Sequence, residues 1–132
     1  MKLKYIRNMT SRNKNESNKG IKLSGSACIV CGWNEHTIDG KSLIEGAHVK
    51  AIETGKEFDK ADNIIALCPN HHTEFDALNF YIDADTKKLF FCYESVYNGK
   101  DVSNNIKHIQ PEYLRYHKYL CDKKWKNVER FI

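Results

Sequence analysis

The 132-residue chain lacks several features that would assign it to other protein classes. It has no apolar run near the roughly 20 residues that a membrane-spanning helix needs, and its N-terminus lacks the apolar core of a signal peptide. No internal repeat and no true linker are visible. Charged residues make up 29% and hydrophobic residues 41%, an ordinary balance for a soluble protein. We therefore expect one soluble domain with a modest core and no membrane partner.

The chain has five cysteines, an odd count that does not suit a disulfide framework. An odd count leaves one cysteine unpaired, and three of the five lie at spacings typical of metal ligands. Metal-bound thiolates suit a reducing compartment better than disulfides would. We therefore expect a cytoplasmic protein.

Four residues have the spacing of a structural zinc site. Cys28 and Cys31 form a C-x-x-C pair, and Cys68 and His71 form a C-x-x-H pair. Together they make the Cys3His ligand set of tetrahedral zinc. A tight knuckle that closes with a helix N-terminus on one zinc is the treble-clef arrangement, and binding energy of order 10 kcal/mol would then be folding energy. The alternative is a set of buried free cysteines with a surface histidine.

Charge is unevenly distributed along the chain. Residues 1–25 carry seven Lys or Arg and one Glu, residues 26–110 carry eight basic and thirteen acidic side chains, and residues 111–132 carry six basic and three acidic ones. An acidic middle that holds a divalent metal, between basic arms that contact phosphates, fits an enzyme of nucleic acids. The alternative is that the arms are simply solvated. The predicted nucleic-acid-binding residues are Arg12, Lys14, Lys22 and Lys50.

The chain divides into three stretches. Residues 1–26 are predicted to form a basic polar arm with Gly20 and Gly25 as breakers, residues 27–92 the core, and residues 93–132 a helical extension packed on that core. Within the core, alternation and β-branched runs predict strands, and Pro69 suits the first turn of a helix. The expected elements are strands within 42–49 and at 63–67, a helix at 70–78, and a hairpin of residues 79–82 and 89–93.

The last segment is predicted to be one helix that starts near Pro111. Apolar and aromatic residues recur there every three or four positions, which indicates a stripe packed on the domain. The stripe consists of Leu114, His117, Cys121, Trp125 and Val128. We expect core packing, and no chemistry, from this helix.

A second constellation lies between and just after the zinc pairs. It contains His48, Asn63, His72 and Asp76. His72 and Asp76 are four residues apart on the predicted helix, so both can reach one ion, whereas His71 points about 100° away around the helix. Taken singly, each histidine would more often be structural or exposed. Their combination predicts a site with chemistry.

Three segments of the chain resemble the HNH endonucleases, which have a ββα-metal fold, also called the His-Me finger. These segments are EGAHVK (45–50), DNIIALC (62–68) and CPNHHTEFD (68–76). The resemblance covers about residues 27–92. It implies an α+β fold in which a ββα-metal finger lies on a treble-clef zinc scaffold, followed by a β-hairpin and a C-terminal helix.

The same resemblance implies metal-dependent hydrolysis of DNA. His48 would take a proton from the attacking water, as an imidazole with an unperturbed pKa near 6.5 can do. His72 and Asp76 would hold a Mg²⁺ or Mn²⁺ ion that binds the scissile phosphate and stabilises the leaving 3′-oxygen. Asn63 would either orient the loop over His48 or join the metal shell. The family's products carry a 5′-phosphate and a 3′-hydroxyl.

One position departs from the family pattern. A His or Asp often precedes the catalytic histidine as a metal ligand, but this chain has Ala47 there. Glu45 is two positions earlier on the same strand face, about 6.6 Å away, and is predicted to supply or assist the missing ligand. The alternatives are that His72 and Asp76 suffice, or that the metal site is degenerate and the protein only binds DNA.

Two classes of function therefore remain. One is an HNH endonuclease acting on double-stranded DNA, either restriction-type or phage-encoded. The other is a non-catalytic treble-clef module that binds nucleic acid, for which the histidine at position 48 would have no role. Restriction, homing, phage packaging and toxin activities all use this fold. One active centre cuts one strand, so a homodimer would make double-strand breaks easy.

Overall fold

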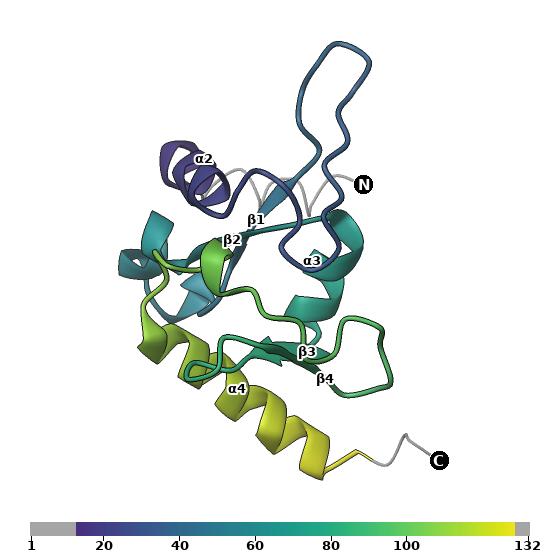
Figure 1. Ribbon diagram of the computed structural model, residues 1–132. Helices are drawn as coiled ribbons and strands as arrows, with labels where there is room; N and C mark the ends of the chain where they lie inside the picture. The colour runs from purple at the N-terminus through teal and green to yellow at the C-terminus, as the bar shows by residue number, and fades with distance from the viewer. Residues whose placement is uncertain (1–12, 129–132) are drawn as a thin grey trace, which may run out of the picture.

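The computed structural model describes residues 13–128, and a two-stranded sheet followed by a helix lies at its centre (Figure 1). Strand β1 (Glu45–His48) pairs antiparallel with strand β2 (Ile64–Leu67), with His48 opposite Ile64. Helix α3 (Pro69–Asp76) starts directly after Cys68, with proline in its first turn. The predicted α+β class and the ββα unit are therefore confirmed, although β1 is shorter than the apolar pattern of residues 42–49 suggests.

The predicted hairpin follows the ββα unit. Strands β3 (Phe80–Ile82) and β4 (Leu89–Phe91) pair antiparallel, with Phe80 opposite Phe91. Their rings stack with centroids 4.6 Å apart, which is the kind of cross-strand pair that stabilises a short hairpin. Asp83 accepts hydrogen bonds from the backbone N–H groups of residues 85 and 86 and so closes the polar turn between the strands.

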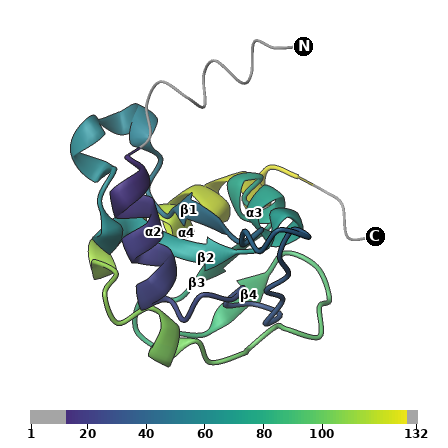
Figure 2. The ribbon, with the colours of Figure 1, turned by 90° about the horizontal axis from the view of Figure 1, so that it is seen from above.

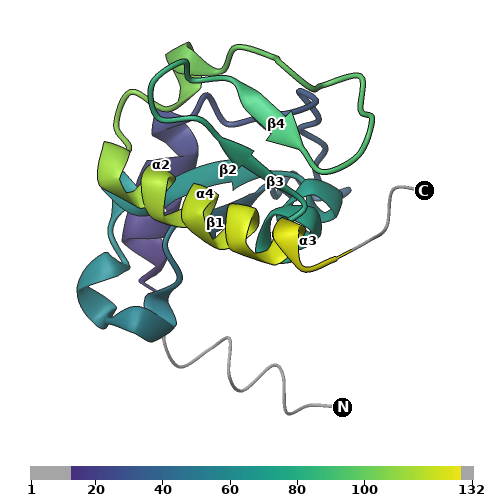
Figure 3. The ribbon, with the colours of Figure 1, turned by 90° about the horizontal axis from the view of Figure 1, so that it is seen from below.

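Helix α4 (Pro111–Lys126) runs along the hairpin on the side opposite to helix α2 (Figures 1 and 3). The residues Leu114, His117 and Cys121 are buried, as the spacing predicts. Trp125 is half-buried and donates from Nε1 to the Leu78 carbonyl at 2.7 Å. Val128 lies beyond the last helical turn and is 39% exposed, so its predicted place in the packed stripe is wrong.

Helix α2 (Lys14–Leu23) corrects the prediction of a polar arm over residues 1–26, in the part of that arm that the structure describes. Asn13 caps the helix by accepting from the N–H groups of residues 15 and 16. Helix α2 lies across β1 and β2 (Figure 2). A Cβ atom at Gly20 would come within 2.6 Å of the Ile64 Cβ, so this glycine permits close contact between helix and sheet and does not break the helix.

Short 3-10 turns fill the connection between β1 and β2. They are η1 (Ile52–Thr54), η2 (Lys56–Phe58) and η3 (Ala61–Asn63), and a further turn, η4 (Ser103–Asn105), precedes α4. A loop with a bridge between His36 and Ser42 protrudes from the body ahead of β1 (Figure 1). Among the residues described, no helix combines the length and apolar character needed to cross a membrane.

A single core joins the ββα unit, the hairpin and α4. Its most enclosed large side chains come from α3, both pairs of strands, the segment before α4 and α4 itself. They include Phe75, Phe80, Ile65, Leu67, Ile82, Leu89, Ile106 and Leu114. The loop before β1 and the turns between β1 and β2 are thus attached to one packed core.

His117 gives a first testable prediction, because its ring lies in this core. The ring is 5% exposed, stacks on Phe75 with centroids 3.8 Å apart, and donates from Nε2 to the Phe80 carbonyl at 3.1 Å. Burial lowers the pKa of His117 to about 4, although the Phe80 carbonyl favours the charged form. We expect its ring resonances in an NMR titration to show a neutral imidazole down to about pH 5.

The same shift has a consequence for stability. Because the folded-state pKa is depressed, the unfolded chain takes up a proton below its ordinary value of 6.5 while the folded chain does not. The free energy of unfolding should therefore fall by up to about 1.4 kcal/mol per pH unit between pH 6.5 and pH 4 through this group. A ring that titrates near pH 6.5 in the folded protein would contradict the buried, neutral assignment.

Candidate active site

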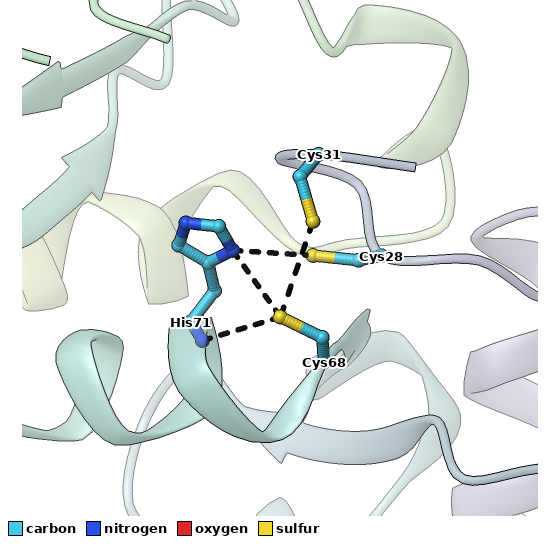
Figure 4. A group of neighbouring side chains, drawn as sticks. All are labelled: Cys28, Cys31, Cys68 and His71. Atoms are coloured by element: carbon cyan, nitrogen blue, oxygen red, sulfur yellow. Dashed lines mark hydrogen bonds between the residues drawn. The ribbon is translucent and has the colours of Figure 1, made fainter. Parts of the chain in front are cut away.

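The four predicted zinc ligands come together at the start of α3 (Figure 4). Cys28 and Cys31 lie in the loop that precedes β1, while Cys68 caps α3 and His71 lies in its first turn. Gly32 adopts a φ of 81° directly after the second cysteine, and its N–H donates to the Cys28 carbonyl at 2.8 Å. Few residues other than glycine adopt this conformation readily, so Gly32 helps the knuckle to turn both thiols inward.

The dimensions of this cluster fit tetrahedral zinc. Its candidate ligand atoms all lie within 4.8 Å of one another. The Cys68 Sγ is 3.3 Å from the His71 Nδ1 and 4.0 Å from the Cys31 Sγ. Zn–S bonds of about 2.3 Å and a Zn–N bond of about 2.0 Å give ligand-to-ligand distances of about 3.5–3.8 Å. The cluster supports the predicted metal site, with zinc as the metal that this ligand set favours.

Burial governs the protonation of the cluster. It raises the pKa of the Cys68 thiol to about 11, and it lowers the pKa of His71. The histidine is therefore neutral and can offer its ring nitrogen to a metal. The thiol must lose its proton on metal binding, so zinc affinity depends on pH.

A separate pocket of about 350 Å³ also borders α3, and none of the four predicted zinc ligands lines it. His48 at the end of β1 and the α3 residues His72 and Asp76 line it, which brings three predicted site residues together. The rest of its wall comes from the turn after β1. That wall consists of Ala51, Ile52 and Glu53.

His48 contacts a carboxylate that the sequence does not single out. Its Nε2 lies 2.8 Å from the Asp59 Oδ1, and the two side chains are 10% and 8% exposed. An ionised carboxylate only accepts hydrogen bonds, so this contact requires a proton on Nε2. The histidine is thus held by a buried acid that lies 11 residues further along the chain. Asp59 follows an irregular segment, and no motif or periodicity marks it.

Asn63 is fully enclosed, and its side chain holds the segment that follows His48. The amide nitrogen donates to the carbonyls of Lys50 and Phe58, and the amide oxygen accepts from the Lys50 N–H, each at 2.8 Å. Three backbone bonds occupy this amide. The geometry favours the first of the two predicted roles, orientation of the loop, over membership of a metal shell.

His72 lies between two carboxylates. Its Nδ1 is 2.7 Å from the Glu45 Oε1, and its Nε2 is 3.3 Å from the Asp76 Oδ2. Burial alone would lower the pKa of His72, but hydrogen bonds with Asp76 and Glu45 outweigh burial and raise it. Glu45 therefore contacts the ring edge away from Asp76, which suits assistance through His72 better than a direct bond to an ion beside Asp76.

The four predicted nucleic-acid-binding residues have different surroundings. Lys14 and Lys22 are exposed on α2. Lys50 instead directs its ammonium group over the Phe58 and Tyr116 rings, 4.4 Å and 4.6 Å from their centroids. Its charge is therefore engaged by aromatic faces within the protein. Arg12 lies outside the described residues.

A model of the HNH endonuclease family matches residues 28–83. This span begins at the first zinc ligand, ends just after β3, and includes His48, Asn63 and His72. The match confirms the predicted family resemblance and supports a nuclease over a zinc module without catalytic function. No curated protein matches the chain.

A solved structure of a modification-dependent TagI restriction endonuclease is similar to this chain. The TM-score is 0.65 at 24% sequence identity, over 83% of this chain. This chain spans 38% of the length of that protein. At this level of identity the likeness shows a shared fold, and that fold extends beyond the family match.

Proposed function

We propose that the HNH endonuclease domain at residues 28–83 hydrolyses phosphodiester bonds of double-stranded DNA with the help of a divalent cation. One observation carries this proposal: a strand-borne imidazole and a helix-borne His–carboxylate pair line the same pocket. The imidazole is His48, and the pair is His72 and Asp76. Facing groups of these two kinds are what hydrolysis of a phosphodiester by an activated water needs.

The roles of the residues follow from their contacts. His48 accepts a proton from the attacking water and is held by Asp59 during that transfer. Asn63 fixes the backbone directly after the histidine, which keeps the imidazole in place. Glu45 accepts a hydrogen bond from the Nδ1–H of His72 and so orients the ring, and a cation beside Asp76 would take the Nε2 lone pair in place of the proton that the Asp76 contact requires.

The charge of the pocket supports a cation requirement. Glu53 and Asp76 line the pocket and Glu45 contacts His72 at its edge, so a phosphodiester would meet several carboxylates. His72 and Asp76 would hold a Mg²⁺ or Mn²⁺ ion, which would supply positive charge for the phosphate and the leaving oxygen. The carboxylate-and-imidazole donor set suits such an ion.

Double-stranded DNA is the substrate we propose, and the biological role we propose is of the restriction type. The HNH family match and the fold shared with a restriction endonuclease support both statements. The exposed lysines of α2 add positive charge beside the sheet that carries His48. One pocket cuts one strand, so two copies acting together would produce a double-strand break.

Metal dependence is tested by nicking of supercoiled plasmid. We expect open circles with Mg²⁺ or Mn²⁺ and none with EDTA, with products that carry 5′-phosphate ends that ligase can rejoin. Asp76→Ala should lower the rate at least about tenfold because it removes a cation ligand. The matched change Asp85→Ala, at an 86%-exposed side chain in the β3–β4 turn, should leave the rate unchanged.

Two results would contradict this function. One is cleavage that persists in EDTA while the zinc content of the protein is unchanged. The other is a folded, zinc-loaded protein that binds duplex DNA and cuts it with neither cation.

A further inference from the structure

We propose that Asp59 and helix α2 together form a positioning unit for His48, a proposal that rests on the nuclease function above. Asp59 is 7% exposed, and each of its carboxylate oxygens has its own donor. Oδ1 accepts from the His48 Nε2 at 2.8 Å, and Oδ2 accepts from the backbone N–H of Asn13 at 2.7 Å. The carboxylate therefore connects the histidine directly to the residue that caps α2.

The start of α2 differs from an ordinary helix start in a way that supports this connection. Asn13 and Glu16 have the spacing of a capping box, in which the glutamate would accept from the N–H of the capping residue. Only half of the box forms here. The Asn13 side chain accepts from the N–H groups of residues 15 and 16, but the glutamate does not accept from the Asn13 N–H. The Asn13 N–H goes to Asp59, and Glu16 accepts from the Ala61 N–H at 2.7 Å.

The bond from Asn13 to Asp59 and the bond from Ala61 to Glu16 hold the same short segment of the chain. Asp59 and Ala61 lie between η2 and β2, 46 and 45 residues from their partners in α2. Hydrogen bonds to ionised carboxylates are stronger than those between neutral groups, so these two bonds hold the segment firmly. The first turn of α2 therefore fixes the segment that carries the acid beside His48.

Helix α2 is itself fixed to the strand that carries the histidine. Gly20 allows the helix to approach Ile64 of β2, and a Cβ at Gly46 of β1 would lie 2.4 Å from the Ser17 hydroxyl oxygen. Alternation along β1 puts His48 on the same strand face as Gly46, toward α2. The helix, the histidine and the acid thus belong to one packed unit.

The unit fixes the tautomer of the imidazole. With the proton on Nε2 donated to Asp59, the Nδ1 lone pair is the one that can take a proton from water. The negative charge of Asp59 then stabilises the imidazolium that forms, although this acid does not touch the reacting atoms. Glu53, His72 and Asp76 share the pocket with His48, so their charges act on the same ring.

The first test changes the acid and reads both tautomer and rate. In ¹⁵N-histidine NMR of the full zinc-loaded chain, we expect the Nε2–H tautomer for His48, with its signals assigned by their loss in His48→Gln. Asp59→Asn should lose this preference and lower kcat by about 10- to 100-fold with KM within twofold. Asp59→Glu should restore part of kcat. Asp39→Asn, which makes the same isosteric change at a solvent-facing carboxylate, should alter neither.

The second test isolates the bond from α2. Asn13→Ala removes the capping side chain but keeps the backbone N–H, whereas Asn13→Pro removes the N–H as well. The φ of Asn13 is −93°, near the range that proline adopts. We expect the proline variant to have a kcat several-fold below that of the alanine variant, with equal zinc content. This pair remains informative if Asp59→Asn does not fold.

The two readouts separate failure of this proposal from failure of the proposed function. If the wild type cuts no DNA, the nuclease proposal fails, while the tautomer in the spectrum still decides the positioning role. An Nδ1–H tautomer in the wild type would overturn that role. So would a folded Asp59→Asn variant with unchanged tautomer and kcat, or equal kcat values for the two Asn13 variants.

Discussion

Replacing Cys28 with serine will leave the domain without a cooperative fold at 25 °C. The thiol is 3% exposed and its Sγ lies 3.7 Å from the His71 Nδ1, within the cluster that fits zinc. A structural Cys3His zinc site contributes apparent binding energy of about 10 kcal/mol or more, whereas small domains are stable by about 5–15 kcal/mol. Loss of the metal therefore removes most or all of the free energy of folding.

The remaining contacts of the knuckle cannot replace the metal. The Ile29 N–H donates to the Ala66 carbonyl of β2, and the Lys100 ammonium donates to the Val30 carbonyl. Such bonds contribute about 1–3 kcal/mol each. The zinc ligands join the knuckle to α3, so their loss also loosens the helix that carries His72 and Asp76.

A matched variant separates ligand loss from cysteine loss. Cys92 is half-buried and lies outside the cluster, so Cys92→Ser should keep one zinc per chain and change the free energy of unfolding by no more than about 1 kcal/mol. Zinc content and urea unfolding followed by circular dichroism measure both variants. A zinc-free Cys28→Ser protein with a cooperative transition near that of the wild type would contradict the structural role. Mutation is preferable to chelation here because EDTA would also remove the divalent cation that we propose for catalysis.

The zinc site and the ββα unit could be predicted from the sequence because their signals are local. Each ligand pair spans four residues, and a tetrahedral ion tolerates few other arrangements of those side chains. β2 is a short apolar run and α3 begins at a proline, so both boundaries are marked within a few residues. The hairpin carries the same kind of mark, a polar turn between two aromatic segments.

Helix α2 could not be predicted in the same way, because tertiary packing decides it. Its sequence is polar, and Gly20 lowers helix propensity by about 1 kcal/mol relative to alanine. The same glycine is what allows contact with Ile64. The Asn13–Glu16 spacing was the one local signal of a helix start, and it is a weak one among so many Asn, Lys and Ser residues.

The role of Asp59 cannot be predicted from the sequence, for a different reason. The residue lies in a segment of 3-10 turns without periodicity, and one aspartate among the chain's acids has no distinguishing spacing. Its pairing with His48 depends on how residues 49–63 turn back, which the Asn63 amide sets through Lys50 and Phe58. The sequence likewise predicts only part of the role of Glu45. Alternation along the strand places it on the face of Ala47, but its contact with the Nδ1 of His72 depends on tertiary structure.

His48→Gln will lower kcat for DNA cleavage by about 10²- to 10⁴-fold while duplex binding stays within about threefold of the wild type. General-base catalysis by a positioned histidine contributes an effect of this size. Glutamine is chosen over alanine because its amide can still donate to Asp59, which otherwise would be left as a buried carboxylate without its histidine partner. The change thus removes the proton acceptor with the least disturbance to the fold.

Single-turnover nicking with saturating Mg²⁺ gives the rate, and fluorescence anisotropy with Ca²⁺ gives duplex affinity. His36 offers the matched control, since it is an exposed histidine in the protruding loop, and His36→Gln should leave both quantities unchanged. A His48→Gln protein that is folded, zinc-loaded and still cuts within threefold of the wild-type rate would rule out His48 as the base. Equal loss of binding and cleavage would instead assign His48 to substrate binding, because an interaction made only in the transition state lowers kcat without weakening the ground-state complex.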